Sequence, residues 1–308
     1  MRMCLVGVPR RMDTVEISPF TFGASDSVLA ARYATLAGSA LTGTTGGSGD
    51  RTGLMIWPGC RAMCRVLASE EGAAIIRGAH VIELGAGPGA CGAVAARNAA
   101  FVLVTDSAPE SVTLSVSTLA ANGVGADRGD AAIFAWGADS PAALVAKITS
   151  TPRRASQRVV VASECAYPSS SDESLLSLFT AIREIIEPAG VAFLSYVSRR
   201  PETTVRVCAA AWKCGLTWHC FAPQSAPAGT DEVGAVVLIM RVRGGFEIDA
   251  SRSALEARLS DLAPEARGLT ENAFPGLGLA AGAEELIRQE NEEELKSYTV
   301  PSADLFTL

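Results

Sequence analysis

Apolar residues in the middle of this chain gather in short runs of strand length, separated by segments of helical length. Between Arg158 and Ser163 the run contains only valine and alanine, without alternating polar positions. Such a run is typical of a strand that is buried on both faces of a parallel sheet. The pattern predicts strands at 80–84, 101–105, 131–136, 158–163 and 191–197.

Segments with helical periodicity alternate with these strands. Residues 172–187 place Leu175, Phe179, Ile182 and Ile186 on one face, which predicts an amphipathic helix. The other predicted helices are 57–67, entered through Pro58, then 89–99, 109–121 and 202–214. Two more apolar segments, 216–221 and 235–242, predict a closing hairpin. Alternating strands and helices of this kind indicate a doubly wound α/β domain.

The chain is long enough to carry additions to one such domain, which we place at 53–243. Residues 1–52 form an N-terminal extension. It contains a β-prone piece at 14–17 that Pro19 is expected to break, and a flexible loop rich in Gly, Thr and Ser at 36–53.

After the domain, residues 244–308 form a C-terminal helical extension. Two helix-like stretches, 251–262 and 282–297, are separated by a segment rich in glycine and proline. The acidic cluster at 290–294 is interpreted as a solvated helix face.

Charge and hydropathy exclude two classes of partner. The net charge is −7, and no basic cluster is longer than two adjacent arginines, so nucleic acid is not the expected partner. An acidic surface suits a basic protein segment or a small molecule. The longest apolar run, 233–240, is far shorter than the roughly 20 residues that span a bilayer, so no membrane association is expected.

Cysteine and histidine usage indicates the compartment. The chain has eight cysteines without a C-x-x-C pair and only two histidines. This pattern predicts neither a zinc site nor a disulfide framework, and we therefore expect no metal. A reducing compartment follows, with the cytoplasm as the first choice and the nucleus as the alternative. A monomer is the default state.

The most specific motif is the stretch 80–92. A buried strand leads into a turn with glycines at 85, 87 and 89, and Glu83 stands two residues before the first of them. Residues without a Cβ let the backbone turn tightly while a ligand lies against it. A helix beginning near Pro88 or Gly89 would present its free N–H groups at this turn. The motif predicts a site for a nucleoside or a carboxylate.

Two cofactor patterns overlap in this motif. Gly87, Gly89 and Gly92 match the dinucleotide fingerprint, whereas Glu83 followed by alternating glycines matches the pattern of S-adenosylmethionine enzymes. A carboxylate at position 83 would attract the cationic amino-acid end of S-adenosylmethionine and repel a diphosphate. Glu83 therefore favours S-adenosylmethionine, and a dehydrogenase is the alternative.

The next predicted strand ends in Asp106. A carboxylate at this place can accept hydrogen bonds from both ribose hydroxyls, which either cofactor would offer. The plainer interpretation is that Asp106 is the N-cap of the helix at 109–121. The strand at 158–163 ends in the sequence Ser163-Glu164-Cys165-Ala166-Tyr167, at the edge where ligands of open α/β sheets bind.

These motifs together carry a resemblance to a known family. The chain resembles the seven-β-strand methyltransferases of methyltransferase family 16, many of which methylate lysines on proteins. The matching segments, in order, are Gly53-x-x-x-Trp57, the loop 83–89, Asp106, Trp136-Gly137 and Glu164-x-x-Tyr167. The resemblance covers about 53–243 and leaves out both extensions. It implies a seven-stranded, mostly parallel, Rossmann-like sheet of the class I methyltransferases.

The resemblance also implies the cofactor, the reaction and the site. The cofactor would be S-adenosylmethionine, the reaction protein-lysine N-methylation, and the partner a lysine-bearing protein segment. Glu164 and Tyr167 would be the catalytic residues, which draw in and orient the acceptor amine. The expected cofactor-binding residues are Trp57, Glu83, Gly85, Gly87, Gly89, Asp106, Trp136 and Ser163.

One departure from the family pattern concerns Glu164, where the family usually has aspartate. Glutamate keeps the charge but moves the carboxylate about one methylene outward, and a displacement of that order can cost around 10²-fold when positioning is the mechanism. The plainer interpretation is that Glu164 caps a loop and Tyr167 packs beside Pro168. Trp57 and Trp136 have a plain alternative as ordinary core aromatics.

Three other residues are assigned structural roles. No histidine lies near Cys165 in sequence, so this cysteine is interpreted as a buried inert thiol. His80 and His219 are likewise expected to be structural.

Three functional hypotheses follow. The first is a protein-lysine methyltransferase, and the second is a small-molecule N- or O-methyltransferase on the same fold. The third is a non-catalytic S-adenosylmethionine-binding protein that docks a partner.

Overall fold

The computed structural model describes residues 14–23, 26–33, 52–167, 170–197, 201–221 and 235–242. The expected C-terminal helices at 251–262 and 282–297, and most of the expected loop at 36–53, lie outside these described residues.

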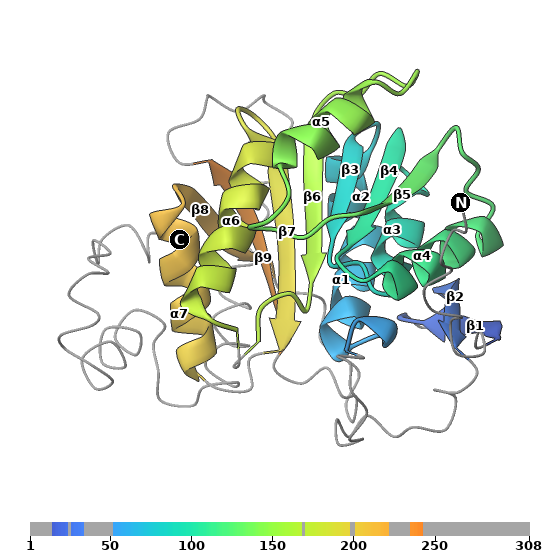
Figure 1. Cartoon of the computed structure of the whole chain (residues 1–308), viewed down its shortest axis with the longest axis horizontal. Coiled ribbons are helices and arrows are strands. Elements are labelled where there is room, and N and C mark those ends of the chain that lie inside the picture. The colour runs from blue at the N-terminus through green and yellow to red at the C-terminus, as the bar shows by residue number, and fades with distance from the viewer. Residues whose placement is uncertain are drawn as a thin grey trace, which may run out of the picture.

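A seven-stranded sheet forms the centre of the fold (Figure 1). Its strands stand in the order β5-β4-β3-β6-β7-β9-β8, and only β9 runs antiparallel to its neighbours β7 and β8. The strands are β3 (His80–Leu84), β4 (Phe101–Asp106), β5 (Gly129–Ile133), β6 (Arg158–Ser163), β7 (Val191–Val197), β8 (Leu216–Phe221) and β9 (Ala235–Val242). This confirms the expected doubly wound, mostly parallel sheet.

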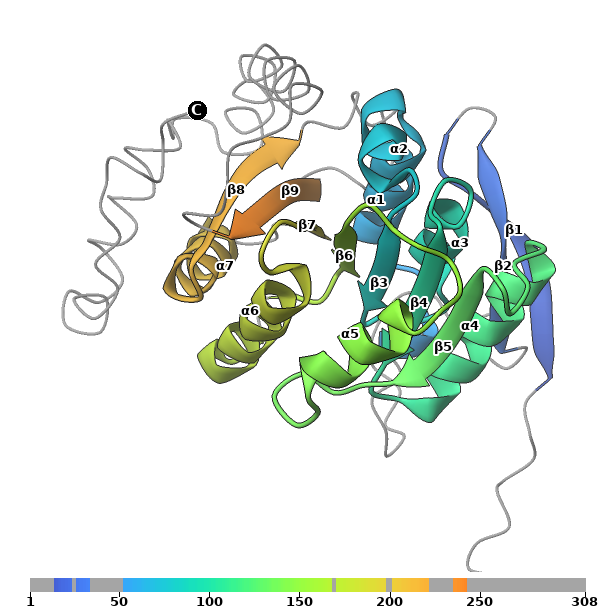
Figure 2. The same cartoon turned by 90° about the horizontal axis from the view of Figure 1, so that it is seen from above.

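Helices cover both faces of this sheet, as Figure 2 shows. Helices α1 (Pro58–Ala68), α2 (Glu70–Ile76) and α3 (Ala90–Ala95) contribute to one core cluster, which also takes Leu119 from α4 (Pro109–Ala121). The opposite cluster takes side chains from α5 (Pro141–Thr149), α6 (Asp172–Ile186) and α7 (Pro201–Lys213). The sheet is therefore covered by helices on both faces.

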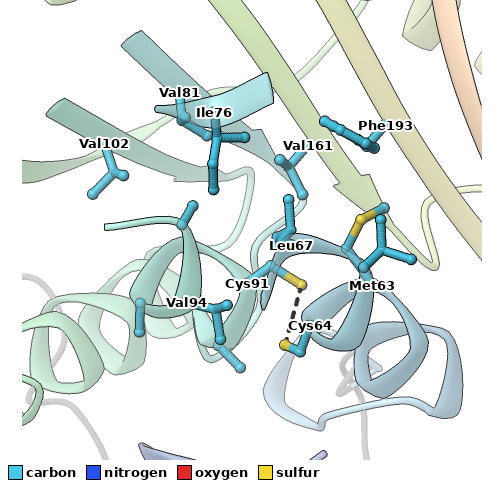
Figure 3. Close-up of a cluster of buried hydrophobic side chains, with 14 of the residues drawn as sticks. Met63, Cys64, Leu67, Ile76, Val81, Cys91, Val94, Val102, Val161 and Phe193 are labelled. Atoms are coloured by element: carbon cyan, nitrogen blue, oxygen red, sulfur yellow. Dashed lines mark hydrogen bonds between the residues drawn. The ribbon is translucent and has the colours of Figure 1, made fainter. Parts of the chain in front are cut away.

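Successive strand residues enter opposite clusters, because side chains alternate across a strand. Val81 and Val102 belong to the first cluster, shown in Figure 3, whereas Ile82 and Leu103 belong to the second. All four are almost completely buried. Burial on both faces explains why the sequence of these strands shows continuous apolar runs and no alternation.

The expected element boundaries agree with most of the structure. The helix predicted at 109–121 is α4, and the strand predicted at 158–163 is β6. The helix predicted at 89–99 is shorter and ends at Ala95, and the strand predicted at 131–136 ends at Ile133. Helices α2 and α5 were not predicted.

A two-stranded antiparallel sheet, β1 (Val15–Thr21) and β2 (Ser27–Tyr33), precedes the domain. The prediction that Pro19 breaks this segment was wrong, because Pro19 lies inside β1. Among the described strands β1 pairs with β2 alone, and a strand at the edge of a sheet tolerates the missing N–H of proline.

This small sheet is hydrogen-bonded to α4. The N–H of Ala31 donates to Thr118 Oγ1 at 2.9 Å, and the N–H of Leu29 donates to Asn122 Oδ1 at 3.0 Å. Asn122 Nδ2 donates back to the carbonyl of Leu29 at 2.6 Å. Part of the predicted N-terminal extension is thereby held against the main domain.

A short 3-10 helix, η2 (Thr52–Leu54), connects to α1. Within the described ranges, every helix is too short or too polar to cross a membrane.

We expect Thr118→Val to destabilise the protein by roughly 1–3 kcal/mol, because it leaves the buried N–H of Ala31 without its acceptor. The measurement is the free energy of unfolding from urea titration. Thr113→Val, on the exposed side of the same helix, is the matched control and should change the free energy by about 0.5 kcal/mol or less. Equal values for the two variants would contradict this docking contact.

Candidate active site

The candidate site lies where the parallel strands end. β3, β4 and β6 are neighbours in the sheet, so the residues that follow them meet at one edge. The strand order reverses at β3. The chain continues from β3 to β4 and β5 on one side of it, and then crosses to β6 and β7 on the other side. Ligands of open α/β sheets bind at such a reversal.

The glycine turn after β3 is packed directly against other segments. Gly85 and Gly87 have φ values of +62° and +52°, which favour glycine. A Cβ on Gly87 would lie 2.9 Å from the carbonyl oxygen of Gly53 in η2. A Cβ on Gly85 would lie 2.7 Å from the sulfur of Cys165 and 3.3 Å from the ring of Trp136. Both positions therefore need glycine for conformation and for space.

Gly89 is the N-cap residue of α3, with φ of +78°. The turn is also tied to α4, because Ser115 Oγ donates to the carbonyl of Gly87 at 2.8 Å.

Glu83 is buried beneath the turn. Its Oε2 accepts a hydrogen bond from the N–H of Gly92 in α3 at 2.7 Å. Burial raises the pKa of this carboxyl well above its usual range, with a further rise from the charge of Cys60, while the hydrogen bond from Gly92 opposes the rise. A cationic group nearby would stabilise the carboxylate. Glu83 therefore fits a positively charged ligand better than an anionic one.

Asp106 links the glycine turn to the segment before α4. Its Oδ2 accepts from the N–H of Gly87 at 2.9 Å, and its Oδ1 accepts from the N–H of Ala108 at 3.0 Å. The N-cap of α4 is Ala108, so the interpretation of Asp106 as that N-cap was wrong. Asp106 instead supports the turn that begins the candidate site.

Glu164, directly after β6, has an unusual backbone. Its φ is +56°, and it is the one non-glycine residue with positive φ in the described part of the chain. Such a conformation costs about 1–3 kcal/mol and is found at functional sites. Its Oε1 accepts from the N–H of Gly59 at 2.8 Å, and its own N–H donates to the carbonyl of Ser195 at 2.7 Å. These contacts hold the carboxylate at the beginning of α1.

Gly59 and Ser195 are site residues that the sequence analysis missed. Ser195 Oγ donates to the carbonyl of Gly59 at 2.9 Å and lies within hydrogen-bond distance of Ser163 Oγ, at 3.1 Å. A Cβ on Gly59 would lie 2.5 Å from Glu164 Oε1. The signals were a serine within the apolar strand 191–197 and a glycine in the first turn of a helix.

The three aromatic candidates differ in exposure. Trp57 is the N-cap residue of α1 and is half-buried, as is Trp136, whose ring faces Gly85. Tyr167 is 39% exposed, and its N–H donates to Ser170 Oγ at 3.1 Å. Trp136 lies beside the glycine turn, and Trp57 lies two residues before Gly59, the partner of Glu164. Tyr167 lies at the surface.

Cys165 is buried among the site carboxylates. Burial raises the pKa of its thiol first, and the charges of Asp106, Glu83 and Glu164 raise it further. The thiol stays protonated at neutral pH, in agreement with the expected inert cysteine.

His80 lies at the opposite end of β3 from the glycine turn, and its Nε2 lies 2.7 Å from the carbonyl oxygen of Arg153. The structure therefore places His80 away from the site. The side chain of His219 lies outside the described residues.

A family model described as lysine methyltransferase, methyltransferase family 16, matches residues 43–206, which is more than half of the chain. No curated protein matches the chain.

Several solved structures are similar to this one. A TehB-like SAM-dependent methyltransferase from Corynebacterium glutamicum shares 14% identity over 59% of this chain and 88% of its own, with a TM-score of 0.43. The ribosomal protein L11 methylase from Lactobacillus delbrueckii subsp. bulgaricus shares 16% identity over 60% and 79%, with a TM-score of 0.40. SMU.776, complexed with SAH, shares 14% identity over 70% and 53%, with a TM-score of 0.44.

The raised pKa of Glu83 predicts a pH dependence of stability. A carboxyl whose pKa is higher in the folded protein holds its proton more tightly there than in the unfolded chain. Its contribution to the free energy of unfolding therefore falls as pH rises from the ordinary value, about 4.3, toward the raised value. The fall is at most about 1.4 kcal/mol per pH unit.

We expect Glu83→Gln to remove this fall. The difference in free energy of unfolding, variant minus wild type, should therefore increase as pH rises. Urea titrations across the acid-to-neutral range measure the difference. Glu184→Gln, which changes an exposed carboxyl of α6, serves as the control. Parallel pH curves for Glu83→Gln and wild type would show that Glu83 does not titrate as described.

Proposed function

This chain belongs to the lysine methyltransferase family and is an S-adenosylmethionine-dependent methyltransferase, and we propose that its acceptor is a lysine side chain of a protein. Family membership decides between the two cofactors that the glycine turn left open. S-adenosylmethionine, when bound, supplies an electrophilic methyl group on a sulfonium centre. The residues of the chain have to bind it, orient the acceptor amine and handle the amine's proton.

The donor set fits this cofactor. Glu83 is a buried carboxyl whose charge a cation would stabilise, and Gly85 and Gly87 leave the turn without side chains. We assign Glu83 to the amino-acid end and Asp106 to the ribose hydroxyls of S-adenosylmethionine. The other residues assigned to cofactor binding are Trp57, Gly85, Gly87, Gly89, Trp136 and Ser163.

The observation that carries the proposal is the strained backbone of Glu164. The structure holds its carboxylate on the N–H of Gly59, one strand away from the glycine turn. One hydrogen bond to its side chain and one from its backbone N–H maintain a conformation that an L-residue rarely adopts, which is the arrangement expected of a residue placed for function.

A lysine acceptor arrives as an ammonium with a pKa of about 10.4, and the ammonium has no lone pair to donate. A carboxylate attracts this group and fixes its direction, but it also raises the pKa of the amine. We therefore assign Glu164 to capture and orientation, with the proton passing to water before transfer. Tyr167 is exposed and follows Glu164 by three residues. We assign it to contact the amine by its hydroxyl or its ring.

The contact with Gly59 gives a reason for glutamate at a position where the family usually has aspartate. On this backbone, the longer side chain reaches the N–H of Gly59 at 2.8 Å. An aspartate would end about one methylene short of that N–H.

We expect Glu164→Gln to reduce methyl transfer by about 10²-fold while leaving affinity for S-adenosylhomocysteine unchanged, because only the positioning of the acceptor is lost. Glu164→Asp should also lose transfer, through the shorter reach. The measurement is incorporation of labelled methyl from S-adenosylmethionine into cell-extract proteins, followed by hydrolysis and identification of methyl-lysine. Glu184→Gln is the control.

The same assay separates the alternatives. Label that enters only the small-molecule fraction would contradict the lysine proposal and favour a small-molecule methyltransferase. Cofactor binding without transfer to any fraction would favour a non-catalytic binding protein.

Calorimetry tests the cofactor assignment of Glu83. We expect S-adenosylhomocysteine to bind and NAD not to bind. Glu83→Gln should weaken S-adenosylhomocysteine at least tenfold, since a hydrogen bond to a charged group contributes about 1.5–3 kcal/mol. Unchanged affinity in the variant would remove Glu83 from the binding site.

A further inference from the structure

Three cysteines from two helices meet in the core beside the candidate site. Cys60 and Cys64 lie one turn apart on α1, and Cys91 lies near the beginning of α3. Cys60 Sγ is 3.4 Å and Cys64 Sγ is 3.9 Å from Cys91 Sγ. Within the residues that the structure describes, this is the one group of three His, Cys, Asp or Glu side chains arranged to hold a metal ion.

The three sulfur atoms have the spacing of a metal site. All of them lie within 4.8 Å of one another. A triangle with sides of 3.4, 3.9 and 4.8 Å has a circumradius of about 2.4 Å, so a point equidistant from the sulfurs lies no further than that from each. Zinc–thiolate bonds are about 2.3 Å long. A single ion at this point would need little movement of the side chains.

The surroundings favour a soft cation. Figure 3 shows Cys64 and Cys91 pointing toward each other among Met63, Leu67 and Val94 of the first core cluster. Cys64 and Cys91 are fully buried, and Cys60 is partly buried. No histidine or carboxylate belongs to the described group, so its donors are sulfur alone. Thiolates select monovalent copper and zinc over harder cations.

We propose that Cys60, Cys64 and Cys91 bind one thiophilic cation, Cu⁺ or Zn²⁺. Each thiol that binds the ion releases its proton to the solvent. This proposal departs from the expectation of no metal, which rested on the lack of a C-x-x-C pair and on the presence of only two histidines. The third cysteine, Cys91, comes from α3, and only the packing of α1 against α3 brings it near Cys60 and Cys64.

The bound ion would connect the two helices that flank the candidate site. α1 begins at the Trp57–Gly59 segment that holds Glu164, and α3 begins at the end of the glycine turn. Bridging these helices stabilises the folded chain, because the sulfurs are brought together only in the folded state. The proposal does not depend on the acceptor of methyl transfer or on cofactor binding.

The test uses the full chain, reduced with a non-thiol reductant and kept free of air. Cu⁺ and Zn²⁺ are titrated separately against a competing chelator, and thiolate-to-metal charge-transfer absorbance and melting temperature are followed. The variants are Cys60→Ala and Cys91→Ala, and the control is Cys214→Ser, which changes a cysteine on the other face of the sheet. Circular dichroism shows whether each variant is folded.

We expect one equivalent of Cu⁺ or Zn²⁺ to bind to wild type and to Cys214→Ser, with charge-transfer absorbance and a raised melting temperature. Cys60→Ala and Cys91→Ala should each weaken metal binding by more than about 100-fold. Loss of a residue that only supports a metal ligand costs roughly 10- to 100-fold, and loss of a ligand itself should cost more. Equal affinities in Cys60→Ala, Cys91→Ala and Cys214→Ser would overturn the proposal. Absence of uptake by reduced wild type, with a Cys60–Cys91 disulfide in the protein as isolated, would also overturn it.

Discussion

The close packing of other segments onto the glycine turn is the constraint on which the rest of the structure depends. Gly85 and Gly87 have no side chains, so the carbonyl of Gly53 and the sulfur of Cys165 approach the turn directly. η2, the loop after β6 and α4 therefore converge on the end of β3. A Cβ at either glycine would meet these atoms at 2.9 Å or less, so the packed segments would have to move away from the turn.

Three carboxylates complete this arrangement: Glu83 and Asp106 are buried, and Glu164 is partly buried. Each of the three accepts a hydrogen bond from a glycine N–H in another segment; the pairs are Glu83–Gly92, Asp106–Gly87 and Glu164–Gly59. The hydrogen bonds fix the carboxylates in place. Burial raises the pKa of Glu83, which disfavours its charged form until a cation lies beside it. A site with this charge is suited to a sulfonium cofactor and an ammonium acceptor, because both bring positive charge.

Much of the fold and part of the site followed from local patterns. Buried strands such as 158–163 and helices such as 109–121 were predicted with their boundaries, since unbroken apolar runs and helix stop signals are local features. The glycine motif and the acidic strand ends were recognised for the same reason. The course of β1 through Pro19 was not, because it depends on which neighbours that strand has in space.

The sequence alone determined the alternation of strands and helices in the main domain, the position of the glycine turn and the acidic residue beside it, because spacing and residue type along the chain decide these. The tertiary structure decided which groups those charges contact. Gly59 and Ser195 became partners of Glu164 and Ser163 only through the packing of α1 against β6 and β7. In the same way, Cys91 met Cys60 and Cys64 across two helices, and a contact between distant segments leaves no periodic signal in either of them.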